Sequence, residues 1–328
     1  MMKKTLVALA AVAVTTGAFA QATMTGSLAY GYRQSQLSTA VTASGIGANS
    51  AAIDFAVTET IEGLGKVSGK MGISSKNSDQ SAAARDSNLK LDLGSAGAFT
   101  MSAVYGYSWL ADTASTGSVA ACSFTNGDCA TGIGHFSTYG YNDNFGYALK
   151  VTDSLSVSFT HTEPNTANSG IGAGASAATS GRYNTYSATY SANNMVVTGG
   201  YRTYDLANVA TANSSYRHRA AFTYNLGVAQ VGAGYEQNTA TYGNTATDTL
   251  FNLALNVPNS PLTVSATFGQ RALAGNATAS ADTVYTGSIY AAKYTLSNRT
   301  SLNATYLTNQ SSGTTNPNFF LATINHSF

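Results

Sequence analysis

The sequence predicts an all-β fold, a transmembrane antiparallel β-barrel of about sixteen strands, from three observations. Charged residues make up only 9% of the 328 residues, whereas soluble domains carry roughly a quarter. No run of about eighteen apolar residues follows the N-terminal segment, which argues against a transmembrane helix. Segments of about ten residues alternate apolar and polar side chains, as strands between lipid and water do.

Residues 1–20 have the layout of a secretory signal peptide. Lys3 and Lys4 form a positive start, a short apolar stretch follows, and an A-x-A cleavage site ends at Ala20. That stretch is too short to span a bilayer. We therefore expect one barrel domain, residues 21–328, in which the 16 Lys and Arg fall by two to 14 against 15 Asp and Glu. Because basic and acidic residues are nearly equal in number, there is no reason to expect nucleic-acid binding.

The alternation is clear at residues 24–33. Met24 and Leu28 share one face of this segment, and Thr25 and Arg33 share the other. A helical period fits neither this segment nor the others like it. Segments with the same two-residue period follow at 66–76, 99–108, 154–160 and 262–271.

Short and long connections alternate between the two-faced segments. The short ones carry tight-turn residues such as Asn193-Asn194, and the long ones are rich in Ser, Ala, Gly, Asn and Thr. This alternation is typical of the periplasmic turns and extracellular loops of outer-membrane barrels. Long connections are expected at about residues 35–50, 77–86, 109–137, 164–181, 206–214, 238–246, 272–282 and 310–317.

The C-terminal part of the chain carries a family resemblance. Apolar and aromatic side chains from Phe320 to Phe328 share one face, and a last strand ending in Phe resembles the assembly signal of outer-membrane barrel proteins. Residues 294–306, YTLSNRTSLNATY, resemble the penultimate hairpin of the Gram-negative general porins, and residues 59–66 are similar to a turn of that family. The chain departs from the family in its low charge and in lacking a P-E-F-x-G motif in the third long connection.

The resemblance implies a sixteen-stranded homotrimeric barrel in the outer-membrane lipid, whose third loop folds inward to narrow a water-filled pore. The expected function is passive diffusion of small hydrophilic solutes and ions, without a cofactor. The alternative is a closed barrel with an adhesive or structural role. Small inward Gly, Ser and Thr residues favour the channel, because a barrel of this size then has room for water.

Strand parity also predicts which charged side chains face the lumen, where they would set selectivity. Basic groups outnumber the inward acids Asp54, Asp92 and Glu236. They form either a ladder that attracts anions or scattered charges that only keep the lumen wet. The predicted inward basic residues are Arg33, Lys66, Lys70, Lys90, Lys150, Arg202, Arg217, Arg219 and Arg271.

The third long connection holds the two cysteines, Cys122 and Cys129. In an oxidising compartment, so close a pair predicts a disulfide that stiffens the loop. Two thiols and His135 are too few ligands for a metal site. By analogy with the family, Asp112 and Asp128 in this connection are expected to face the basic wall.

No catalytic site is predicted. The four histidines, His135 among them, are scattered along the chain. No Ser/His/Asp arrangement with nucleophile-elbow spacing occurs. Three histidines lie by parity on the outer face, where we expect interfacial side chains: His161, His218 and His326.

Overall fold

The structure is a computed structural model, and every structural statement below concerns the residues that it describes. The predicted signal peptide lies outside them. Among the described residues, no helix is long and apolar enough to span a membrane. Their one helical element of more than a single residue is the three-residue 3-10 turn η1 (Gly94–Ala96). The described ranges are 21–38, 41–75, 83–84, 86–107, 114, 138–165, 182–204, 216–239, 245–274, 283–311 and 318–328.

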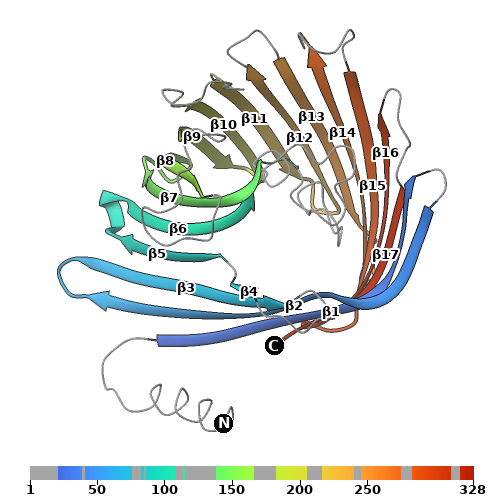
Figure 1. Cartoon of the computed structure of the whole chain (residues 1–328). Coiled ribbons are helices and arrows are strands. Elements are labelled where there is room, and N and C mark those ends of the chain that lie inside the picture. The colour runs from blue at the N-terminus through green and yellow to red at the C-terminus, as the bar shows by residue number, and fades with distance from the viewer. Residues whose placement is uncertain are drawn as a thin grey trace.

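The strands form one closed antiparallel sheet in which each strand pairs with its neighbours in the chain and β17 pairs with β1. β4 and β5 both pair with β3, at successive parts of its length, so the seventeen strands occupy sixteen positions. The predicted barrel and strand number are thereby confirmed. Figure 1 shows the ring in chain order. Its first strands are β1 (Gln21–Ser38), β2 (Val41–Ile61), β3 (Gly65–Ser75), β4 (Ala83–Ala84), β5 (Ser87–Asp92), β6 (Ala98–Tyr107), β7 (Thr138–Lys150) and β8 (Leu155–Asn165).

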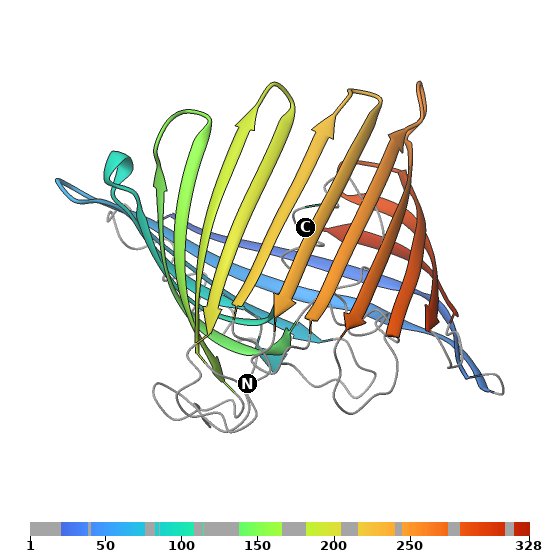
Figure 2. The same cartoon turned by 90° about the horizontal axis from the view of Figure 1, so that it is seen from above.

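The second half of the ring is more regular, with strands of ten to thirteen residues. Figure 2 shows these strands side by side, tilted and joined at one end by short turns. Two turn residues, Asn193 and Asn194, have φ of 51° and 64°, a left-handed conformation that asparagine tolerates. These strands are β9 (Tyr183–Ala192), β10 (Met195–Tyr204), β11 (Tyr216–Asn225), β12 (Ala229–Thr239), β13 (Thr245–Asn256), β14 (Leu262–Ala274), β15 (Thr283–Thr295), β16 (Thr300–Ser311) and β17 (Asn318–Ser327).

One predicted connection is wrong. Residues 35–50 were expected to form a long loop, but β1 continues to Ser38 and β2 begins at Val41. The Ser, Ala and Gly content of this segment predicted a loop, whereas strand pairing uses only backbone N–H and C=O groups. The hairpin extends the sheet, and its Ile46 is 88% exposed.

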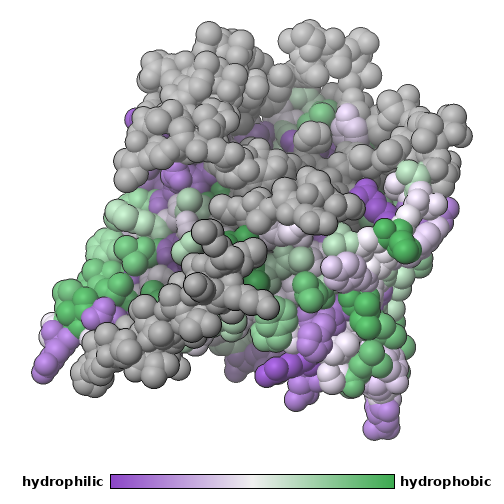
Figure 3. All heavy atoms as spheres, turned by 60° about the horizontal axis from the view of Figure 1, so that its bottom comes forward, coloured by the Kyte–Doolittle hydropathy of each residue, from purple (hydrophilic) through white to green (hydrophobic). Residues whose placement is uncertain are grey.

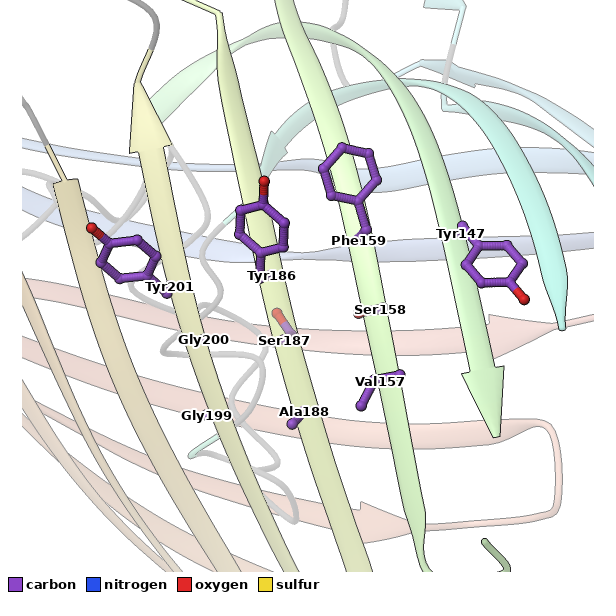
Figure 4. Close-up of a pocket in the computed structure, with 10 residues that line it drawn as sticks. All are labelled: Tyr147, Val157, Ser158, Phe159, Tyr186, Ser187, Ala188, Gly199, Gly200 and Tyr201. Atoms are coloured by element: carbon purple, nitrogen blue, oxygen red, sulfur yellow. The ribbon is translucent and has the colours of Figure 1, made fainter. Parts of the chain in front are cut away.

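The outer face of the barrel is apolar and aromatic. Figure 3 shows hydrophobic side chains, in green, on the flanks of the outer wall and hydrophilic ones, in purple, toward the lower rim. Figure 4 shows four rings on neighbouring strands: Tyr147 on β7, Phe159 on β8, Tyr186 on β9 and Tyr201 on β10. They border a shallow apolar groove. Aromatic rings with a polar tip suit the boundary between lipid and water.

The last residue closes the ring against the first strand. The backbone N–H of Phe328 donates to the Gly26 carbonyl and that of Gly26 donates to the Phe328 carbonyl, both at 3.0 Å. The Phe328 ring lies over Gly26, where a side chain on the glycine would occupy the ring's position. The terminal Phe therefore has a defined seat in the closed barrel, and its role as an assembly signal stays a prediction.

Candidate functional site

The strand register and the buried positions place all nine predicted basic residues on the inner face of the barrel. Their role in selectivity remains a prediction. The four other predicted site residues of the third long connection, Asp112, Cys122, Asp128 and Cys129, lie outside the described residues. The inner face is thus the candidate site, and its charges fall into two different groups.

The lysines form isolated pairs with acids. Lys70 Nζ lies 3.3 Å from Asp54 Oδ2, and Lys90 Nζ lies 2.9 Å from Asp92 Oδ2. At the short-turn end of β7, Lys150 Nζ lies 3.0 Å from Asp153 Oδ1. Each pair is at least partly exposed and has no formal net charge. Lys66 stands at the short-turn end of β3, opposite Thr60 on β2 and Asp92 on β5. This half of the wall therefore does not form the continuous basic ladder that the sequence suggested.

The arginines, in contrast, gather on the opposite half of the wall, near the strand ends that border the long connections. The register places Arg219 opposite Glu236, Glu236 opposite Asp248, and Asp248 opposite Arg271. These four side chains form one row across β11, β12, β13 and β14. Arg202 and Arg217 stand beside it, on adjacent strands β10 and β11. We call these six residues the arginine cluster.

The carboxylates of the arginine cluster are shared among its guanidinium groups. Arg217 Nη1 lies 3.0 Å from Glu236 Oε1, and Arg219 Nη1 lies 3.7 Å from Glu236 Oε2. Arg271 Nε lies 3.7 Å from Asp248 Oδ1. Glu236 is 3% exposed, so these contacts occur away from bulk water, where a charge interaction is screened least.

The arginine cluster carries an excess of positive charge. Four guanidinium groups face two carboxylates, which leaves two formal positive charges on this part of the wall. Guanidinium groups remain protonated at any physiological pH. A confined, partly dry region of one sign focuses its field into the lumen and raises the local concentration of oppositely charged solutes. This arrangement can therefore attract anions.

Sequence reasoning missed three members of this region. Asp248 shares the inner face of β13 with Leu250 and Ala254, and this mixed pattern hid its direction. Tyr183 and Tyr204 also face inward, at the ends of β9 and β10 that border long connections, with ring centroids 5.5 Å apart. The alternation of these two tyrosines with polar residues along their strands was the signal in the sequence that could have identified them.

The remaining predicted arginine stands apart, beside an apolar row of the inner wall. The Arg33 guanidinium lies over the Phe319 ring, 4.8 Å from its centroid. Phe319 is paired with Leu307 on β16, and Leu307 with Ile289 on β15, and all three are buried. The lumen is therefore polar on only part of its circumference.

The third long connection reaches the inner wall at one described residue. Ala114 is fully buried, and its carbonyl oxygen lies where a Cβ on Gly232 would stand. Gly232 faces inward on β12, one inward position from Gly234 and two from Glu236. The absence of a side chain at Gly232 is therefore what lets the Ala114 backbone approach the wall.

Known proteins share this architecture. The family model of the Gram-negative porins matches residues 6–314. The structure is similar to the anion-selective porin from Comamonas acidovorans, with TM-score 0.68, 13% identity and coverage of 94% of this chain and 100% of that one. It is also similar to the outer membrane channel DcaP of Acinetobacter baumannii, with TM-score 0.66, 11% identity and coverage of 95% and 99%. No curated protein sequence matches the chain. Identities this low establish the shared fold alone.

Proposed function

We propose, from the premise that the chain belongs to the Gram-negative porin family, that its channel passes anions more readily than cations. The chain is an outer-membrane diffusion channel for small hydrophilic solutes and ions. The observation that supports the preference is the arginine cluster, with four guanidinium groups against two carboxylates on the inner wall. We propose that the protein acts as a channel and not as an enzyme.

Uptake of sugars that differ mainly in charge tests this preference. In liposomes containing the protein, we expect glucuronate to enter faster than glucose, and glucose faster than glucosamine, because the cluster concentrates anions and repels cations. Swelling rates in iso-osmotic solutions, corrected for the counter-ion, measure this order. Glucosamine entering fastest would contradict the proposal.

We further infer that the chain assembles as a homotrimer, as its family resemblance implies. The outer face offers an apolar surface for contact: Met24, Phe55 and Met71 lie in one row across β1, β2 and β3. Met24 is 61% and Met71 56% exposed. Methionine packs adaptably against irregular partners. A single-subunit mass for the unheated protein in mild detergent would oppose the trimer.

A further inference from the structure

The hairpin of β1 and β2 projects beyond the strands beside it. β2 pairs with β1 from Val41 onward, but its pairing with β3 begins only at Ala51. Among the described residues, the first part of β2 therefore has a strand on one side only. Figure 2 shows this hairpin, in dark blue, extending past the adjacent strands at the end that carries the long connections. We call residues 43–50 of β2 the open edge.

The open edge is uncovered on both faces of the hairpin. Successive side chains of a strand point to opposite faces, yet every residue from Ala43 to Gly47 is exposed. Ile46 is the most exposed of them, at 88%. A Cβ added to Gly45 or Gly47 would meet nothing within 4 Å. The described part of the chain thus leaves this stretch without packing on either side.

The open edge lacks most of the features that keep a free strand from pairing. Natural sheets protect such edges with charged side chains, prolines, bulges or a covering segment. Residues 34–53 contain no Asp, Glu, Lys, Arg or Pro. A β-bulge lies at the base of the open edge, between the pairs Ala29–Ser50 and Tyr30–Ala48, and the pairing beyond it is regular. The backbone N–H and C=O groups that point away from β1 are therefore available to another strand.

The outer face of the hairpin continues the apolar surface that we propose for subunit contact. On this face Ile46 stands opposite Tyr32. Tyr30 stands opposite Ala48 on the same face. Tyr30 is 53% and Tyr32 39% exposed, and both follow Met24 along β1 at even spacing. Lipid can cover these side chains but cannot form hydrogen bonds with a strand edge. A protein partner satisfies both.

We infer that the open edge and Ile46 dock onto a second copy of this chain. This inference rests on the proposed homotrimer and names the segment that fastens one subunit to the next. A threefold contact is heterologous, so each hairpin meets a different surface of its neighbour. The exposed outer row Tyr290, Tyr306 and Phe320, across β15, β16 and β17 on the other side of β1, has the matching apolar character.

Photocrosslinking from position 46 tests the docking in the outer membrane. With benzoylphenylalanine in place of Ile46, illumination is expected to join two copies of the chain, with adducts on β15–β17. Coexpression of a labelled and an unlabelled copy separates adducts between copies from those within one. The same crosslinker in place of Phe251, on the outer face of β13, should not join copies. Adducts of position 46 with lipid or with another protein alone would overturn the inference.

A charge at the open edge provides the second test. Ile46→Asp should weaken the association of subunits about tenfold, because the contact would bury a carboxylate without a counter-charge. The barrel should still fold, since Ile46 is almost fully exposed in its own subunit. Leu226→Asp makes the same exchange at a turn position that is 58% exposed and should leave association unchanged. The mass of the unheated proteins in mild detergent, followed over a dilution series, measures the effect.

The outcomes separate the docking from the proposed homotrimer. A wild-type trimer that is equally stable in Ile46→Asp, with no adduct between copies from position 46, overturns the docking and leaves the homotrimer standing. A wild-type protein with the mass of a single subunit overturns both. If Ile46→Asp does not fold, Ile46→Ser decides in its place: a weakened trimer supports the docking, and an unchanged one contradicts it.

Discussion

Replacing Arg202 by glutamate is expected to abolish the anion preference of the channel. The substitution changes the arginine cluster from four positive and two negative groups to three of each, so its excess charge disappears. It also places an acid directly opposite Arg217, where an opposite-charge pair is favourable, so the barrel should remain stable. The reversal potential in a KCl gradient should move close to zero, and heat-modifiable migration of the protein should be retained.

Lys66→Glu provides the matched control for Arg202→Glu. It makes the same change in formal charge on the inner wall but lies at the short-turn end of β3, away from the arginine cluster. Solvent screens charges beyond about 8–10 Å at moderate salt, so its effect should be small. Equal shifts in the two variants would show that selectivity follows total lumen charge, and would contradict the role given to the cluster.

Substituting valine for Gly232 is expected to change the conductance of the channel strongly. A Cβ at this position would overlap the carbonyl oxygen of Ala114, so either the wall or the segment containing Ala114 must move. Overpacking of this kind costs about 1–3 kcal/mol, and displacement of the segment from the wall relieves it. Because Ala114 lies against the inner wall at Gly232, its displacement should alter the open cross-section and hence the single-channel conductance.

Gly199→Val is the control for that experiment. Gly199 faces outward on β10, with open space around the position of an added Cβ. The two variants add the same atoms to a glycine within a strand. We expect the wild-type conductance in Gly199→Val and an altered one in Gly232→Val. Identical conductance in both variants and the wild type would mean that the Ala114 contact does not shape the pore.

The sequence was sufficient to predict the inner and outer faces because a strand has a strict period of two. Arg217 and Arg219, two residues apart, had to share a face, and the aromatic residues near them had to share the other. The same parity placed Glu236 inward. Each of these expectations needs only local geometry, which the order of side chains within one strand already determines.

Which charged residues pair with one another could not be predicted in the same way. Which residue of β12 stands opposite Arg219 depends on the register across the turn at residues 226–228, and a shift of two positions would replace Glu236 by another inward side chain. Parity likewise could not distinguish the lysines that acids neutralise, such as Lys70 beside Asp54, from Arg202, which has no ion-pair partner among the described residues. Nor does any sequence pattern indicate that Ala114 lies against Gly232, because that contact joins distant parts of the chain.

The central claim is that the arginine cluster gives this channel a preference for anions, and the reversal potential of the wild-type protein in a KCl gradient tests it most directly. If chloride crosses more readily than potassium, chloride carries negative charge toward the dilute side. We therefore expect the dilute compartment to become negative at zero current, with a magnitude that falls as the overall salt concentration rises and screens the cluster. A dilute compartment that becomes positive would show cation preference and contradict the account.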